Sequence, residues 1–234
     1  DLLLPTLGLI QNNPNTQLIT VSNYTRNSLL YHYGISPNKV KVLYSPERVY
    51  YNLSEKVENA DLADLISKKK KYYLMLSANR NSKNPYKAVR AFKRYSEIDK
   101  EAYFILVGYP CKLFEKMLNP SSLSDSDLAL AIQHCYALVY PTFFEGFGYP
   151  AIEAMHYAKP VLASNVTSLP EVFEDVPIYF SPLYETEIFN ALIKLTDENY
   201  IGLCQKSAAQ YEKVKKRQEQ DLEQLINMIL SKHQ

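Results

Sequence analysis

Glycine is the residue that this chain uses most sparingly. It accounts for only 6 of the 234 residues, whereas an average chain contains about 7%. A chain with so few glycines is expected to place them where φ is positive or where two backbones approach closely. Two of the six, Gly146 and Gly148, lie one residue apart, so the segment that contains them is a first candidate for a functional loop.

The chain also lacks an excess of charge of either sign. It has 26 basic and 25 acidic residues, for a formal net charge of +1. This balance excludes a polybasic protein that binds nucleic acid through bulk charge, and we expect no nucleic-acid partner. Hydrophobic residues make up 47% of the chain and charged residues 22%, which is typical of a folded chain rather than a disordered one.

Cysteines and long apolar runs are scarce as well. The three cysteines are widely spaced and include no C-x-x-C pair, which argues against a disulfide framework and favours a reducing, cytoplasmic location. Apolar stretches such as 103–107 are far shorter than the roughly 18 residues of a membrane span. We expect no transmembrane segment, and peripheral contact with a membrane stays open. Because no basic region precedes the first apolar run after Asp1, the start is interpreted as the edge of a longer protein.

From residue 72 onward, apolar runs alternate with helix-favouring segments. The runs are continuously apolar, which is typical of parallel strands that are covered on both faces. We therefore predict an α/β fold with a doubly wound, mostly parallel, Rossmann-like sheet. Strands are predicted over 72–77, 102–107, 137–140, 161–163 and 178–180, and helices over 86–97, 124–134, 151–157, 169–173 and 185–196.

A strand-helix-strand unit is predicted ahead of this sheet, over 17–21, 23–33 and 39–44. Ser22 is well placed to cap the helix at its start, and Gly34 is well placed to end it. We expect residues 1–48 to form one unit and 49–234 a second, which ends in a long helix over 197–232.

The most informative segment runs from Tyr140 to Met155 and reads YPTFFEGFGYPAIEAM. A buried strand is predicted to end at Tyr140, and a loop with both glycines follows. Pro150 suits the first turn of the next helix. This arrangement places backbone N–H groups and the positive end of a helix at the C-terminal edge of a parallel sheet, where anionic phosphates bind.

Two glutamates flank the same helix start, Glu145 on the loop and Glu153 within the helix. Carboxylates repel a phosphate, so these two glutamates are not expected to bind one. They are suited instead to accept hydrogen bonds from sugar hydroxyls. For a pair of glutamates at this spacing alone, helix capping and solvation would be the simpler interpretation.

The string EGFGYPAIEAM, followed by KPVLASNVTSLPEV from Lys159, resembles the signature of retaining glycosyltransferases of family four, which have the GT-B fold. The resemblance covers residues 72–196, the donor-binding half of such an enzyme. It implies that Glu145 contacts the donor sugar near the reacting carbon and that Glu153 holds the ribose. It also implies that the backbone of Gly146, Phe147, Gly148 and Tyr149 lies along the diphosphate and the hexose.

A second segment, SANRNSKNPYKAVRAF from Ser77, resembles the basic pair of the same family. Arg80 and Lys83 are expected to neutralise the diphosphate as the glycosidic bond breaks. Asn79 is expected to contribute to donor binding. The sequence departs from the family's commoner Gly-Arg form, because Ala78 and Asn79 stand in its place, so the assignment of Lys83 is the firmer of the two.

The sequence Asp125-Ser-Asp127 has the form of a metal-binding D-x-D motif. However, Ser124 and Asp127 have the spacing of a capping box that opens a helix, and we favour that interpretation. We predict no metal ion and no cofactor; the nucleoside diphosphate sugar is the donor substrate.

The start of the chain, from Ile19 to Pro46, resembles the end of the family's N-terminal domain, which binds the acceptor. The resemblance implies a missing acceptor domain, a chain that is one GT-B half with an N-terminal remnant, and weak activity of the chain alone. Loops at 107–109 and 120–123 are candidates for binding the base.

The leading hypothesis is a donor-binding half that moves a hexose, with retention, from a nucleoside diphosphate sugar to a hydroxyl acceptor in polysaccharide or glycoconjugate synthesis. The resemblance implies that diphosphate leaves through an oxocarbenium-like state; a double displacement through Glu145 is the less favoured route. The alternatives are a nucleotide-sugar epimerase or phosphorylase-like enzyme of the same fold, and a non-catalytic module that binds nucleotide sugars.

Overall fold

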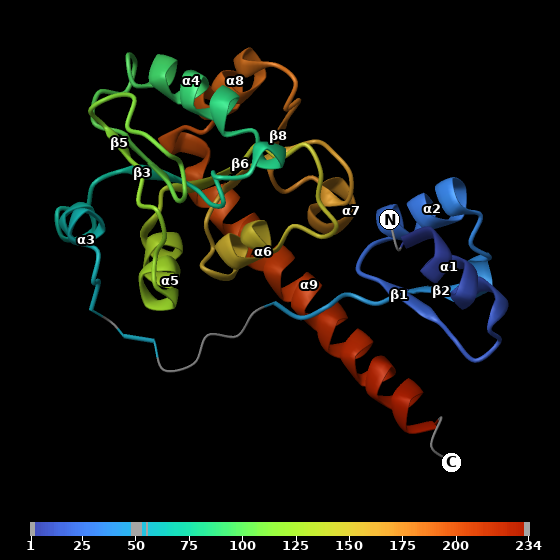
Figure 1. Ribbon diagram of the computed structural model, residues 1–234. Helices are drawn as coiled ribbons and strands as arrows, with labels where there is room; N and C mark the ends of the chain where they lie inside the picture. The colour runs from blue at the N-terminus through green and yellow to red at the C-terminus, as the bar shows by residue number, and fades with distance from the viewer. Residues whose placement is uncertain (1–2, 48–52, 55, 232–234) are drawn as a thin grey trace.

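The computed structural model describes residues 3–47, 53–54 and 56–231 of the chain (Figure 1). It contains a six-stranded sheet and a separate pair of strands. The boundary predicted between residues 48 and 49 lies outside the described residues, as does Lys232 at the predicted end of the last helix.

All neighbouring strands of the large sheet are parallel, in the order β5-β4-β3-β6-β7-β8. The doubly wound, mostly parallel sheet predicted from the sequence is therefore confirmed. The strands are β3 (Tyr72–Met75), β4 (Tyr103–Leu106), β5 (Met117–Leu118), β6 (Ala137–Tyr140), β7 (Val161–Ser164) and β8 (Ile178–Phe180).

The two faces of this sheet carry separate hydrophobic clusters because successive side chains of a strand point to opposite sides. On β3, Tyr73 and Met75 join the cluster beneath α4 (Pro85–Tyr95) and α8 (Glu185–Lys194). The side chains of Tyr72 and Leu74 join the other cluster. That cluster is covered by α3 (Ala60–Ser67), α5 (Asp125–His134), α6 (Tyr149–His156), α7 (Leu169–Phe173) and α9 (Asp197–Leu230).

The small unit consists of two parallel strands and two helices. Its elements are α1 (Leu3–Asn12), β1 (Leu18–Thr20), α2 (Asn23–Tyr33) and β2 (Val40–Val42), with a 3-10 turn, η1 (Pro37–Lys39). Both predicted ends of α2 are confirmed. The Ser22 hydroxyl accepts a hydrogen bond from the Thr25 N–H, and Gly34 adopts φ +63° at the C-terminal cap.

Several contacts join the small unit and the segment after β2 to the rest of the chain, and two of them are made by carboxylates. The Glu171 carboxylate on α7 accepts hydrogen bonds from the backbone N–H groups of Asn23 and Tyr24, at the start of α2. On α9, the Asp221 carboxylate accepts a hydrogen bond from the Tyr44 N–H, 2.8 Å away. Figure 1 shows α9, in red, running from the large sheet toward the small unit. This long helix therefore supports the segment that leads from β2 to the large sheet.

The secondary structure departs from the prediction at two places. The helix α1 was not predicted, and Pro5 is compatible with it because proline is tolerated in a first helical turn. The edge strand β5 was also missed, since a strand of two residues has no detectable period. The other strands and helices lie within about three residues of their predicted limits.

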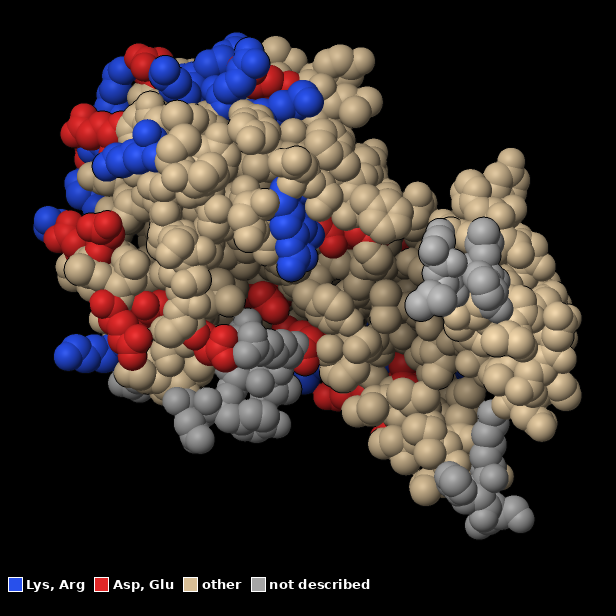
Figure 2. All heavy atoms as spheres, viewed as in Figure 1, with Lys and Arg blue, Asp and Glu red and all other residues tan. Residues whose placement is uncertain are grey.

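Basic and acidic side chains are interspersed on the face of the large-sheet part drawn in Figure 2, with basic residues most frequent near α4 and α8. This agrees with the net charge of +1. Within the described ranges, no helix is both long enough and apolar enough to cross a membrane.

The predicted capping role of Ser124 is confirmed, since its hydroxyl accepts a hydrogen bond from the Asp127 N–H. The buried carboxylate of Asp127 has a further role. It accepts hydrogen bonds from the backbone N–H groups of Glu58 and Asn59, at 2.8 and 3.0 Å. Asp127 therefore connects the start of α3 to the start of α5. In the part of the chain that the structure describes, no three His, Cys, Asp or Glu side chains are grouped to hold a metal.

Replacing Asp127 with alanine is expected to lower the free energy of unfolding by about 2–3 kcal/mol, because two backbone donors lose a charged acceptor. Urea denaturation of the full chain measures this. The control is Asp61→Ala, which removes an exposed carboxylate from the first turn of α3 and should cost less than about 1 kcal/mol. Equal losses for the two variants would contradict the role assigned to Asp127.

Candidate functional site

The ends of β3 and β6 define the candidate site. These two strands are neighbours in the middle of the sheet. From β3 the chain adds β4 and β5 on one side, and from β6 it adds β7 and β8 on the other, so the direction of strand addition reverses between β3 and β6. Such a reversal of strand order leaves a crevice at the C-terminal edge of a parallel sheet, where ligands bind. The two loops that leave this edge contact each other, since the N–H of Phe143 donates to the backbone oxygen of Ser82 at 2.8 Å.

The loop after β6 leads into the N-terminus of α6. Gly148 is the N-cap residue and adopts φ +107°, and Pro150 follows in the first turn. Among the described residues, the backbone N–H groups of Phe147, Gly148 and Tyr149 have no hydrogen-bond acceptor. These donors, together with the positive end of the helix dipole, form a suitable site for a phosphate.

Close packing explains why Gly148 is a glycine. A Cβ atom at this position would lie 2.7 Å from Leu169 Cδ2 and 2.9 Å from Phe173 Cε2. The side chain of the preceding residue, Phe147, is buried and packs edge-on against Tyr44 at a centroid distance of 5.0 Å. Phe147 can therefore offer a ligand its backbone, as the family resemblance implies, while its ring belongs to the core.

Lys83 and Glu145 form an ion pair across the two loops. Lys83 ends the 3-10 turn η2 (Asn81–Lys83), which follows β3, and Glu145 lies on the loop after β6. The two side chains are only 11% and 13% exposed, so water screens their charges less than at an open surface. The Lys83 ammonium also lies 3.4 Å from the Tyr140 hydroxyl.

The hydroxyl of Tyr140 lies close to both glutamates. Its burial raises its pKa well above the ordinary value, and the negative charges of Glu145 and Glu153 raise the pKa further. Burial and the neighbouring carboxylates thus favour the neutral phenol, which can both donate and accept a hydrogen bond. The structure thus brings Lys83 and Glu145, two of the residues predicted from the sequence, to one buried hydroxyl, on which Glu153 acts through its charge.

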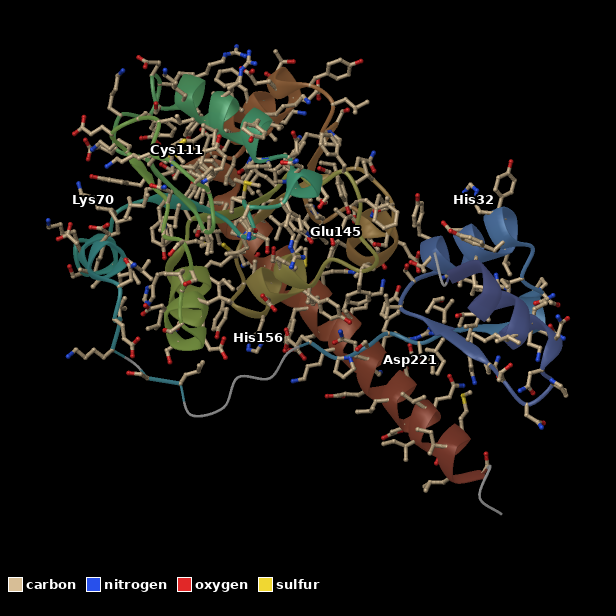
Figure 3. All side chains as sticks on the ribbon, viewed as in Figure 1. His32, Lys70, Cys111, Glu145, His156 and Asp221 are labelled. Atoms are coloured by element: carbon tan, nitrogen blue, oxygen red, sulfur yellow. The ribbon has the colours of Figure 1, made fainter. Side chains whose placement is uncertain are left out.

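The backbone of Glu145 is held by the loop that follows β7. Its N–H donates to the Thr167 hydroxyl at 3.1 Å, and its carbonyl oxygen accepts a hydrogen bond from the Ser168 hydroxyl at 3.1 Å. Thr167 adopts φ +51°, which is uncommon for a β-branched residue. Figure 3 shows Glu145 among the loops near the middle of the molecule.

Arg80 and Asn79 lie on the same loop as Lys83 but are exposed. Among the described residues, Arg80 forms no ion pair. The side chain of Asn79 lies beside Gly108, where an added Cβ would be 3.3 Å from Asn79 Cβ. Diphosphate binding by Arg80 and donor binding by Asn79 therefore stay predictions, because neither side chain contacts Lys83 or Glu145 in a hydrogen bond or ion pair.

Sequence reasoning missed three residues of the site. Tyr140 was treated only as the end of a strand, and Thr167 and Ser168 only as part of the segment SNVTSLPE. A tyrosine at the C-terminal end of a buried strand is an available signal, because its hydroxyl needs a polar partner. No local pattern reveals the contacts of Thr167 and Ser168, which depend on how two loops meet.

Residues 57–217, more than half of the chain, match the family described as glycosyl transferases group 1. The chain belongs to this family.

Two curated relatives are mannosyltransferases. The O-antigen chain mannosyltransferase RfbU of Salmonella typhimurium is 25% identical over 181 residues, which cover 70% of this chain and 46% of that protein. The O-antigen chain mannosyltransferase B of Escherichia coli is 48% identical over 58 residues, or 25% of this chain and 15% of that protein. The chain therefore spans less than half the length of these relatives.

Solved glycosyltransferase structures have the same fold. A glycosyltransferase from Rickettsia africae superposes with a TM-score of 0.73 at 17% identity, covering 96% of this chain and 66% of that one. The Anabaena protein HepE, in complex with UDP and glucose, gives a TM-score of 0.74 at 16% identity, with 97% and 67% covered. The glycosyltransferase family and the GT-B fold predicted from the sequence resemblance are confirmed, whereas retention stays a prediction.

Substitution by alanine is expected to have opposite effects on stability at two glycines, one closely packed and one not. Gly148→Ala should lower the free energy of unfolding by about 2–4 kcal/mol, because the new methyl group meets α7 and the backbone is strained. Gly202→Ala is the control: Gly202 lies in α9 with no atom within 4 Å of an added Cβ. This control should stabilise the chain by up to about 1 kcal/mol. Urea unfolding measures the free energy of unfolding of both variants. A Gly148→Ala variant as stable as the original chain would contradict the close packing described here.

Proposed function

We propose that this chain is the donor-binding part of a glycosyltransferase that moves a hexose from a nucleoside diphosphate sugar to a hydroxyl acceptor, with retention. One observation carries the proposal. The Lys83–Glu145 ion pair lies where β3 and β6 end, and the loop that carries Glu145 leads directly into the bare N–H groups at the start of α6, the helix that carries Glu153. A diphosphate and a sugar require these two kinds of group side by side.

The leaving diphosphate gains negative charge as the glycosidic bond breaks. The N–H groups of Gly148 and Tyr149 and the ammonium of Lys83 are positioned to stabilise that charge. The guanidinium of Arg80, exposed on the same loop, would add a further cation from the solvent side. Charge stabilisation of the leaving group is the main contribution of this half of the site to catalysis.

The sugar is assigned to the two glutamates. Glu145 would accept hydrogen bonds from the hexose hydroxyls near the reacting carbon, and Glu153 from the ribose. Lys83 and Glu145 neutralise one another in the structure. When the donor binds, the Lys83–Glu145 ion pair would separate. Lys83 would then bind a phosphate oxygen, and Glu145 would accept hydrogen bonds from the sugar.

The base is assigned to two loops that lie side by side. The Gly108 N–H donates to the Pro120 oxygen at 2.8 Å, and the Asn119 side chain donates to the Tyr109 oxygen at 3.1 Å. Both loops were candidates by position in the sequence. The rings of Tyr86 and Tyr109 pack edge-on at 6.0 Å and would give a planar base an apolar wall.

The transferred hexose is proposed to be mannose, because the curated relatives are named as O-antigen mannosyltransferases. Synthesis of a surface polysaccharide follows as the proposed setting. Acceptor choice, and the activity of a whole enzyme, extend beyond the portion of those relatives that this chain matches.

Calorimetry with GDP, UDP, ADP and their sugars tests the donor site. We expect saturable binding of at least one nucleotide, weakened at least tenfold by Lys83→Ala, because a charge-assisted contact to phosphate is lost. Glu153→Ala should weaken binding of the same nucleotide by about the same factor, through its contact with the ribose.

The matched control for the lysine is Lys206→Ala, on the exposed face of α9, which should leave the affinity within twofold. If no nucleotide binds, the proposal of a donor site is wrong and a non-nucleotide binding module is favoured. Equal weakening by Lys206→Ala and Lys83→Ala would show that the effect comes from net charge rather than from the site.

A further inference from the structure

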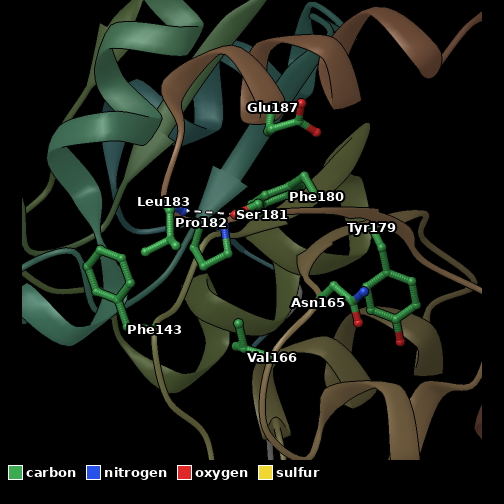
Figure 4. A pocket seen from close by; sticks show the side chains of 9 residues that line it. All are labelled: Phe143, Asn165, Val166, Tyr179, Phe180, Ser181, Pro182, Leu183 and Glu187. Atoms are coloured by element: carbon green, nitrogen blue, oxygen red, sulfur yellow. Dashed lines mark hydrogen bonds between the residues drawn. The ribbon is translucent and has the colours of Figure 1, made fainter.

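A second pocket lies at the same edge of the sheet, beyond the ends of β7 and β8 (Figure 4). Its volume is about 520 Å³, and it is lined by residues from the loops after β6 and β7, from β8 and the loop after it, and by one residue of α8. Neither Lys83 nor the start of α6 lines it. It is therefore distinct from the proposed diphosphate site, although Phe143 in its wall belongs to the loop that carries Glu145.

The walls of this pocket are held by hydrogen bonds that leave its shape well defined. The Tyr179 hydroxyl donates to the Leu169 oxygen at 3.2 Å, and the Asn165 N–H donates to the Phe180 oxygen at 2.9 Å. The buried side chain of Asn84 donates to the Pro182 oxygen at 2.9 Å. A pocket with fixed walls loses little conformational entropy when a ligand binds.

The polar groups of the pocket are an amide, a hydroxyl and a carboxylate. They belong to Asn165, Ser181 and Glu187. Within the described part of the chain, neither the Asn165 amide nor the Glu187 carboxylate has a hydrogen-bond or ion-pair partner. Both groups are therefore available to a ligand, the carboxylate as an acceptor only and the amide as donor and acceptor.

Aromatic and aliphatic groups form the rest of the wall. In Figure 4 the ring of Phe143 lies on the opposite side of the pocket from Tyr179 and Asn165. Leu183 adds an exposed apolar surface. Flat rings beside convergent polar groups match a pyranose, which has apolar C–H faces and a rim of hydroxyls.

The charge of the pocket argues against a phosphate. None of the described residues that line it is lysine, arginine or histidine, and Glu187 is acidic. The Lys87 ammonium, which is not part of the lining, lies 5.4 Å from the centroid of the Phe143 ring. A neutral polyhydroxyl ligand suits this lining, whereas an anion would be repelled.

We infer that this pocket binds a neutral pyranose, held by Glu187 and Asn165 against the rings of Phe143 and Tyr179. The source of the sugar is either the hexose of the donor or a unit of a glycan chain. The inference rests in part on the proposed function, because the Phe143 side of the pocket belongs to the same loop as Glu145.

The test uses the full chain labelled with ¹⁵N and titrated with methyl α-mannoside and with α-mannobiose. At least one of them should bind saturably and shift the amide signals around Asn165 and Glu187. Glu187→Gln should weaken this binding about tenfold, because a hydrogen bond to a charged acceptor is lost. Asn165→Leu is a second variant and should weaken it similarly. The control is Glu198→Gln. Glu198 is an exposed glutamate in the first turn of α9, the same helical position that Glu187 has in α8, and its substitution should leave saccharide binding unchanged.

Two outcomes identify the source of the sugar. If Glu187→Gln weakens binding of a nucleotide sugar but not of the matching nucleoside diphosphate, the pocket holds the donor hexose. If it weakens only mannobiose, the pocket holds a glycan unit. Absence of saturable binding by every saccharide and nucleotide sugar, or binding unaffected by both pocket variants, overturns the inference. Failure of the proposed donor site is recognised separately, because the nucleoside diphosphates alone would then not bind.

Discussion

The ion pair between Lys83 and Glu145 joins the two loops that form the proposed donor site. One partner follows β3 and the other follows β6, and these strands are neighbours at the point where the order of the sheet reverses. Because both side chains are mostly buried, separating them without a replacement partner would leave a poorly solvated charge on each side. A ligand that supplies an anion for Lys83 and hydroxyls for Glu145 removes that penalty.

The surroundings of this pair hold it in a defined place. Tyr140 lies beneath it as a neutral phenol, and Thr167 and Ser168 fix the backbone of Glu145 from the neighbouring loop. Gly148 allows α6 to pack closely against α7, so that the helix start opens toward the same edge. Of the six glycines, Gly34, Gly108 and Gly148 have the positive φ expected of a chain that uses few, whereas Gly8 and Gly202 lie in helices with open space around an added Cβ.

Sequence alone predicted the parts of this architecture that follow from local pattern. Continuous apolar runs identified the central strands, because a strand covered on both faces carries no polar residue. The Ser22 and Gly34 caps and the Ser124 cap were recognisable from residue type and spacing. The string from Glu145 to Glu153 combined a loop, two glycines and a helix start, and it therefore led to the site directly.

What sequence reasoning missed depends on contacts between distant segments. The hydrogen bonds of Glu171 to the start of α2 and of Asp127 to the start of α3 join residues more than 60 positions apart, and no local period encodes them. The pocket near Glu187 was likewise unforeseen, since its lining comes from four separate segments. The short strand β5 was missed because two residues carry too little pattern.

The central claim is that backbone N–H groups at the start of α6 bind a diphosphate beside Lys83. Backbone amide chemical shifts of the full chain, recorded during titration with the nucleoside diphosphate that binds, test it most directly. The largest shifts are expected at Phe147, Gly148 and Tyr149, with further shifts at Lys83. Saturating binding that leaves these amides unchanged and shifts signals elsewhere in the chain would contradict it.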